Sequence, residues 1–299
     1  MSSLRVMQLA TILVHVAIGV CVGYALEAQK PLSRMGAGIP QSTYADLTRF
    51  AKYSSAAYQA LCPRPLGNTL VEEFRNVLTS TAGYVARDDQ RREIVVAFRG
   101  SQQLEDFLID GGLVQVLYQS PGVQPNTTDV VMAHAGFLLA YNSVYSTVLD
   151  AIGTQLKQHK NYSIVSTGHS LGGALASLGG LSIKSNFPMA NVRLYTFGQP
   201  RTGNAAYADL VQQVVGSENI YRAVHTYDGV PTMVPEELDY RHHEREFWQF
   251  EEPPEPATVI QCEGQEDPTC SDSIPTTGIN VAHPFYFGQI MSLDATLCL

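Results

Sequence analysis

The sequence predicts an α/β protein with a mostly parallel central sheet. Segments with strand and helix patterns alternate along the chain, which is typical of parallel sheets connected by helices. The run Glu93–Phe98 is apolar and β-branched, as central strands of such sheets are, and Tyr162–Ser166 alternates around a β-branched pair. Because no repeat and no long linker divides the chain, we expect one domain over residues 29–299.

The other elements follow from the spacing of apolar residues. Helical spacing predicts helices at 43–60, 136–149, 174–181 and 204–215. Further strands are expected at 74–78, 82–86, 191–198 and 220–224, and a last hairpin at 247–250 with 257–261. Residues 102–109 form a short amphipathic segment, which is either an ordinary connection or a movable flap over a site.

Composition describes a globular protein with a sizeable core. The chain has 299 residues, of which 45% are hydrophobic and 16% charged. Its formal net charge of −9 argues against nucleic acid as a partner, and against electrostatic attraction to an anionic membrane. Contact with a neutral lipid or oil surface stays open.

The N-terminus is predicted to be a signal peptide of about 28 residues. Arg5 precedes the apolar stretch Leu9–Val22, and small residues follow at Gly23–Ala25 and at Ala28. The alternative is a membrane anchor, because Val6–Leu26 carries no charge. The short apolar core favours cleavage, so we expect a secreted protein without stable membrane insertion.

Cysteine usage agrees with export. One cysteine lies in the predicted signal and leaves four, Cys62, Cys262, Cys270 and Cys298. An even number in an exported chain suggests two disulfides, for which three pairings exist. Cys262 and Cys270 flank an acidic loop that they are able to close locally, which would leave Cys62 for Cys298.

Two sequons fit the same compartment. Asn126 and Asn161 each begin an N-x-S/T acceptor and are predicted sites of N-linked glycans. Asn161 comes just before a predicted buried strand, so we expect Asn126 to be the more exposed of the two.

The stretch Gly168-His169-Ser170-Leu171-Gly172-Gly173 has the pattern of a nucleophile elbow, because a predicted strand precedes it and a helix follows. A serine at the tip of such a strained turn needs neighbours without Cβ atoms two residues away on either side. The helix N-terminus then points N–H groups at any oxyanion that forms there. We therefore expect Ser170 to be a nucleophile. The alternative is a glycine-rich turn in a nucleotide-binding sheet.

A serine nucleophile needs a base and a carboxylate that orients the base. In this fold class the carboxylate and then the histidine follow the serine along the chain. Asp228 lies in a turn after a predicted strand, where either an orienting carboxylate or a turn-capping aspartate is expected. His283 is the last histidine, so the chain order favours it as the base.

The remaining histidines fit this order less well. His225 precedes Asp228, and His242 and His243 lie in a run of charged residues that predicts a solvated face. Three others lie before or beside the nucleophile and are expected to be structural: His134, His159 and His169.

Six motifs occur in a characteristic order: Phe98–Ser101, His134–Phe137, Gly168–Gly173, Gly198–Arg201, Asp228–Pro231 and His283–Gly288. Together they resemble the secreted fungal class 3 lipases of the Rhizomucor and Thermomyces type, with their related feruloyl esterases. The resemblance covers residues 43–299 and implies an α/β-hydrolase fold.

The same resemblance implies a role for each site residue. Ser170 would be the nucleophile, Asp228 the orienting acid and His283 the base, with Ser101 and the N–H of Leu171 as the oxyanion hole. No cofactor and no metal is implied. The likeness also supports the disulfides Cys62–Cys298 and Cys262–Cys270.

By this likeness residues 102–109 become the family's lid, with apolar side chains at Leu104, Phe107, Leu108 and Ile109. Phe107 stands where these lipases usually carry Trp, and Ala282 stands where many carry Asp. The apolar lid and Ser101 favour a lipid ester over an aryl ester.

The expected protein is thus a secreted, monomeric acylglycerol lipase acting at an oil–water interface. The alternatives are a feruloyl or other aryl esterase, and a catalytically inactive binding protein on the same scaffold.

Overall fold

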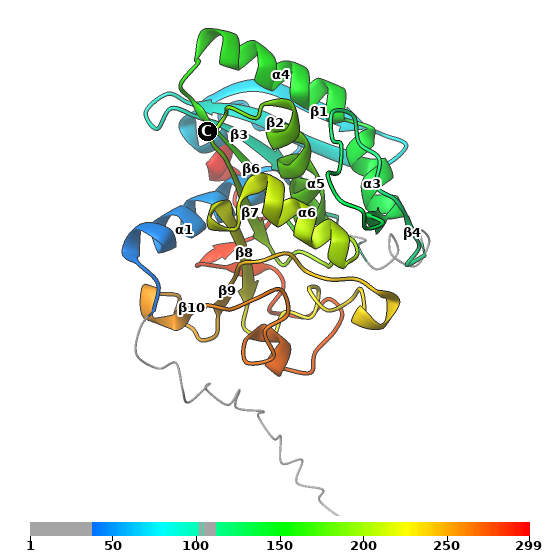
Figure 1. Cartoon of the computed structure of the whole chain (residues 1–299). Helices are drawn as coiled ribbons and strands as arrows, with labels where there is room; N and C mark the ends of the chain where they lie inside the picture. Colours follow the sequence, from blue (N-terminus) through cyan, green and yellow to red (C-terminus); the bar gives the residue numbers. More distant parts are fainter. Residues whose placement is uncertain (1–37, 102–103, 105–111) are drawn as a thin grey trace, which may run out of the picture.

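The computed structural model describes residues 38–101, 104 and 112–299 (Figure 1). The predicted signal segment lies outside the described residues, as does the predicted lid apart from Leu104. An eight-stranded sheet runs through the molecule in the order β1-β2-β3-β6-β7-β8-β9-β10. Sequence neighbours are therefore also spatial neighbours in most of the sheet.

The centre of the sheet is parallel, as predicted. Its five parallel strands are β3 (Glu93–Phe98), β6 (Ser163–His169), β7 (Val192–Phe197), β8 (Ile220–His225) and β9 (Glu246–Gln249). Antiparallel strands complete both edges: β1 (Thr69–Asn76), β2 (Thr81–Asp88) and β10 (Val259–Gln261). Two small pairs lie apart from the sheet: β4 (Gln115–Leu117) with β5 (Met132–His134), and β11 (Phe285–Tyr286) with β12 (Gln289–Ile290).

Helices cover both faces of this sheet (Figure 1). The helix α1 (Gln41–Ala56) packs on one face, and the other carries α3 (Ala135–Asn142), α4 (Tyr145–Gln158), α5 (Leu171–Asn186) and α6 (Ala205–Val215). Side chains of β3 alternate between the two cores, because successive residues of a strand point to opposite faces. Ile94 and Val96 join the core under α4 and α5, whereas Val95 and Ala97 join the core under α1.

One predicted helix is wrong in its extent. The segment 136–149 is not continuous but is divided into α3 and α4 at Ser143 and Val144. The Ser143 hydroxyl donates to the carbonyl oxygen of Ala140 at 2.7 Å and lies 2.8 Å from the Thr79 hydroxyl. Such local bonds compete with helix continuation, which the apolar spacing alone does not reveal.

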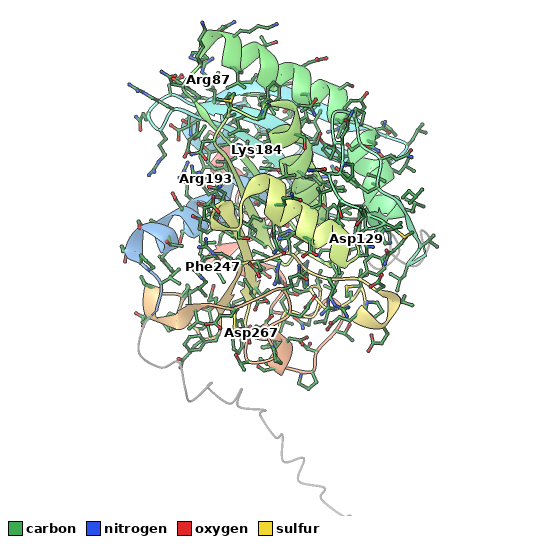
Figure 2. The ribbon with its side chains drawn as sticks, in the orientation of Figure 1. Arg87, Asp129, Lys184, Arg193, Phe247 and Asp267 are labelled. Carbon is green, nitrogen blue, oxygen red and sulfur yellow. A yellow bond between two sulfur atoms is a disulfide. The ribbon has the colours of Figure 1, made fainter. Side chains whose placement is uncertain are left out.

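Charged side chains fix α1 at the sheet edge opposite the carboxyl ends of the parallel strands. Glu93, the first residue of β3, accepts from Arg49 of α1 at 2.6 Å and from Arg193 of β7. Arg193, labelled in Figure 2, also lies 3.3 Å from Asp46. The carboxyl edge of the sheet is thereby left for the site. Among the described residues, no helix combines the length and the apolar character needed to cross a membrane.

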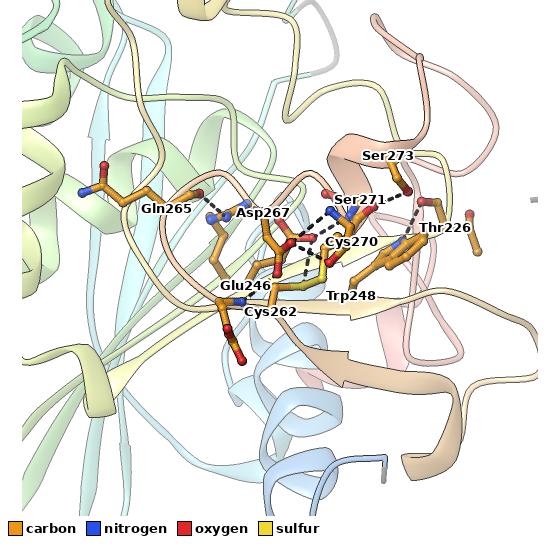
Figure 3. Close-up of a disulfide and its surroundings, with 12 residues drawn as sticks. Thr226, Glu246, Trp248, Cys262, Gln265, Asp267, Cys270, Ser271 and Ser273 are labelled. Atoms are coloured by element: carbon orange, nitrogen blue, oxygen red, sulfur yellow. Dashed lines mark hydrogen bonds and ion pairs between the residues drawn. A yellow bond between two sulfur atoms is a disulfide. The ribbon is translucent and has the colours of Figure 1, made fainter. Parts of the chain in front are cut away.

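Both disulfides favoured by the sequence are present. Cys62 after α1 is bonded to Cys298 near the C-terminus, with Cα atoms 4.5 Å apart. Cys262 and Cys270 close the acidic loop after β10, as Figure 3 shows. Glu246 lies beside this second disulfide and accepts the N–H of Ser271 at 3.1 Å. Because both sulfurs are bonded to each other, this group offers no thiolate to a metal.

Candidate active site

Ser170 occupies a strained turn between β6 and α5. Its φ of 60° and ψ of −130° lie in a backbone region that residues other than glycine rarely adopt. Glycine is needed on both sides, because a Cβ on Gly168 would overlap the carbonyl oxygen of Gly172, and a Cβ on Gly172 would overlap that of Phe98. The sequence pattern therefore corresponds to an elbow in the structure.

The backbone of Ser170 is held by a hydrogen bond, whereas its hydroxyl has no hydrogen-bond partner among the described residues. The backbone N–H of Ser170 donates to the carbonyl oxygen of Phe197 at 2.9 Å, which ties the turn to the end of β7. The side chain is buried, and its Oγ has no hydrogen-bond partner within the described part of the chain, His283 included. Several other buried hydroxyls share this feature, so the chemical role of Ser170 is indicated by the strained turn and the absence of a partner together.

Asp228 and His283 form a buried pair. His283 Nδ1 lies 2.9 Å from Asp228 Oδ2 and 3.1 Å from Oδ1. The Tyr286 hydroxyl donates to Oδ2 at 2.5 Å and the Val230 N–H to Oδ1 at 2.9 Å. Since a carboxylate only accepts, Nδ1 of His283 carries the proton and Nε2 is left with a lone pair.

Electrostatics keep this carboxyl group ionised. Burial alone would raise the pKa of Asp228. The charge of His283 and the hydrogen bonds from His283, Tyr286 and Val230 outweigh burial, so the pKa lies below its ordinary value. Asp228 is therefore suited to orient the imidazole and to stabilise its protonated form.

His169 joins the elbow to the base. Its ring centroid lies 4.4 Å from that of His283, and its Nε2 donates to the His283 carbonyl oxygen at 2.9 Å. The other ring nitrogen accepts from the Tyr58 hydroxyl at 2.7 Å. Burial, followed by the charge of His283, lowers the pKa of His169 to about 3, so the ring is neutral. The residue beside Ser170 is thus in contact with the segment that carries His283.

The two expected oxyanion donors lie beside the elbow. Leu171 is the first residue of α5, so its N–H has no acceptor within the helix. Ser101 follows Gly100, which lies against the elbow: a Cβ atom added to Gly100 would be 2.6 Å from the carbonyl oxygen of His169. Ser101 is half-buried. Of the expected lid side chains, Leu104 is fully buried, whereas Phe107, Leu108 and Ile109 lie outside the described residues.

The loops that carry the acid and the base are joined to each other. Thr232 Oγ1 donates to the Thr276 carbonyl oxygen at 2.5 Å. The N–H of Gly278 donates to the carbonyl oxygen of Gly229 at 3.1 Å. Asn280 Nδ2 donates to the Tyr227 carbonyl oxygen at 2.7 Å. The sequence reveals neither these contacts nor a role for Tyr286, because no spacing pattern signals bonds between residues so far apart in the chain.

The expectation that His242 and His243 lie on a solvated face is wrong. Both side chains are buried; His242 Nε2 donates to the carbonyl oxygen of Pro231 and His243 Nδ1 to that of Glu244. The charges around them are paired with other segments, as Glu246 is with Arg222 at 3.1 Å. Pairing lowers the cost of burial, which the run of charges in the sequence does not indicate.

The fold and this arrangement define an α/β-hydrolase. An elbow serine, a buried carboxylate–histidine pair and a helix N-terminus meet at the carboxyl edge of a parallel sheet. In that setting the groups are placed for acyl transfer through a serine.

Comparison with known proteins identifies the family. The family model for lipase (class 3) matches residues 95–238. A secreted alkaline triacylglycerol lipase of Penicillium cyclopium is 28% identical over 274 residues, which cover 90% of this chain and 94% of that protein. The lipase of Rhizomucor miehei is 34% identical over 224 residues, covering 73% of this chain and 58% of that protein.

Solved structures agree. The crystal structure of a lipase from Rhizopus microsporus var. chinensis is 30% identical, with a TM-score of 0.75, and the match covers 88% of this chain and 92% of that one. The chain therefore belongs to the fungal class 3 lipase family and is a carboxylic-ester hydrolase.

Proposed function

We propose that this protein is a secreted lipase that hydrolyses acylglycerols through Ser170, Asp228 and His283. The observation that carries the proposal is the buried Asp228–His283 pair beside an elbow serine whose hydroxyl has no partner in the described residues. The name of the Penicillium cyclopium relative, a triacylglycerol lipase, supports the substrate class.

The geometry supports a two-step acyl transfer. His283 Nε2 takes the proton of Ser170 Oγ as that oxygen attacks the ester carbonyl carbon. Ser101 and the Leu171 N–H stabilise the oxyanion, and the loss of one such donor typically costs about 10²–10³ in kcat. His283 gives the proton to the departing alcohol, and water then cleaves the acyl-enzyme by the same route.

Exposed apolar side chains support a lipid surface as the place of action. Tyr227, next to Asp228, is 45% exposed, and Val281, two residues before His283, is 71% exposed. Val114 and Leu117, which follow the proposed lid segment, are 56% and 58% exposed. Exposed apolar side chains next to Asp228 and His283 in the chain favour binding to an apolar phase, and the proposed lid at 102–109 would add its own apolar residues.

The test is a substrate panel on purified protein. Wild type is expected to hydrolyse tributyrin and longer triglycerides faster than methyl ferulate, with a jump in rate above the solubility limit. Ser170→Ala is expected to be secreted and folded but inactive. Full activity of Ser170→Ala would refute the proposed nucleophile, a preference for methyl ferulate would favour an aryl esterase, and failure of a serine-directed phosphonate to label wild type would favour an inactive binding protein.

We also propose export as a monomeric single domain, with cleavage near residue 28 and glycans on Asn126 and Asn161. Both asparagines are exposed, as glycosylation requires. N-terminal sequencing of the secreted protein and its shift in mass after enzymatic deglycosylation test these points. An intact N-terminus, or an unchanged mass, would contradict them.

A further inference from the structure

We infer that Glu252, acting through His225 and Gln249, positions the segment that carries His283. The inference rests on the proposed function, in which His283 is the base. His225 ends β8 and Gln249 ends β9, and the two residues are paired in register. Glu252 follows three residues after Gln249 and touches both side chains.

The first contact runs through His225. Its Nδ1 lies 2.8 Å from the carbonyl oxygen of Ala282 and its Nε2 lies 2.7 Å from Glu252 Oε1. A carbonyl oxygen only accepts, so Nδ1 of His225 donates to Ala282, and the other side of the buried ring lies against the Glu252 carboxylate. Glu252 thereby holds the donor that fixes Ala282, the residue before His283.

The second contact runs through Gln249. Its Nε2 donates to the same Oε1 of Glu252 at 2.8 Å, which turns its own Oε1 toward the N–H of Phe287 at 3.0 Å. The Gln249 side chain is fully buried. One carboxylate oxygen therefore orients two side chains, which hold the main chain at Ala282 and at Phe287.

Between these two points lie the groups that hold the orienting acid. His283 and Tyr286 both bond Asp228 Oδ2, at 2.9 and 2.5 Å. A shift of the segment would move both groups relative to Asp228, and a misplacement of about 1 Å costs up to about 10²-fold in rate. Glu252 makes no bond to Ser170, so it is a positioning residue.

Glu252→Ala tests this inference with little risk to the core, because the Glu252 side chain is 51% exposed. On a soluble short-chain ester we expect kcat to fall about tenfold while KM changes by less than about twofold. Glu237→Ala, which removes the same charge from an exposed residue with no contact to this segment, is the matched control and is expected to equal wild type. A wild-type kcat in Glu252→Ala would overturn the inference.

Variants of His225 provide the second test. His225→Asn retains an N–H donor toward Ala282 and is expected to keep kcat within about threefold, whereas His225→Leu is expected to match the loss in Glu252→Ala. Because Glu252 acts on Ala282 through His225, the loss in the double variant His225→Leu/Glu252→Ala should be smaller than the product of the two single losses. Losses that multiply would contradict a shared path.

A measurement without substrate separates this inference from the proposed function. The proton on His283 Nδ1, bonded to Asp228, reports the position of the base by NMR in the resting protein. Glu252→Ala and His225→Leu are expected to shift or broaden its resonance, and Glu237→Ala to leave it unchanged. Unchanged resonances in the first two variants would refute the positioning role. A wild type that hydrolyses no ester would refute the proposed function instead.

Discussion

His169 donates a hydrogen bond from Nε2 to the carbonyl oxygen of His283, at 2.9 Å. One of these residues immediately precedes the elbow serine, and the other carries the proposed base. The bond therefore joins two segments 114 residues apart in the chain at the point where they must act together. Its geometry depends on the neutral ring, since Nδ1 accepts from the Tyr58 hydroxyl.

His169→Leu is therefore expected to lower kcat on a soluble ester by about ten- to a hundredfold, because the backbone of His283 loses a buried donor. Tyr58→Phe removes only the bond to Nδ1 and is expected to have a smaller effect. Circular dichroism checks that both variants fold. If His169→Leu keeps the wild-type kcat, the contact does not position the base.

Local signals in the sequence were sufficient for the central strands and for the elbow. β3 has the predicted bounds, and Ser170 lies between the end of β6 and the start of α5, as the glycine spacing predicts. What could not be predicted depends on contacts across the fold. At the division of helix 136–149, Ser143 bonds Thr79 of a distant segment, and near the buried His243 a charge pair joins Arg222 of β8 to Glu246 of β9.

The two disulfides should contribute unequally to stability. Cys62–Cys298 spans 236 residues and Cys262–Cys270 spans 8. In the loop-entropy model these separations correspond to about 5 and about 2.5 kcal/mol of stabilisation. The free energy of unfolding in urea of the two double-alanine variants measures the difference. The acidic loop also has a local bond from the Thr269 hydroxyl to Asp267, the residue labelled in Figures 2 and 3, and we expect this bond to persist without the disulfide. A larger loss from opening the short loop would contradict this order.

Buried neutral histidines should make the protein sensitive to acid. Burial is the largest cause that lowers the pKa of His243, to about 4, against about 6.5 in an unfolded chain. Below pH 6.5 the unfolded state binds the extra proton, so stability is complete above that pH and is lost as pH falls toward 4. For one such histidine the loss between pH 6.5 and 5 is about 2 kcal/mol.

His243→Asn isolates this contribution, because an asparagine amide does not titrate and still offers a donor toward the Glu244 carbonyl oxygen. Urea unfolding at pH 7 and pH 5 should show a smaller loss of stability in the variant than in wild type. An equal loss in both proteins would mean that other groups cause the acid sensitivity.

Gly198 borders the acid and the base at once. Its φ of +56° lies in the left-handed region, and a Cβ at this position would lie 2.7 Å from Asp228 Oδ2, 2.8 Å from the Tyr286 hydroxyl oxygen and 3.0 Å from His283 Cε1. All three separations are shorter than ordinary contacts of a methyl group. Gly198→Ala must therefore move the carboxylate or the imidazole, and it also strains the backbone.

We expect Gly198→Ala to lower kcat by about 10²-fold, with a smaller effect on KM, since the change disturbs the Asp228–His283 bond rather than substrate contacts. Gly180→Ala is the matched control: its Cβ would meet only side chains, at 3.5 Å or more, within α5. Activity and thermal unfolding of both variants are compared. Loss of stability without loss of kcat in Gly198→Ala would show that the site tolerates a methyl group there, and that the close packing around Asp228 is not needed for catalysis.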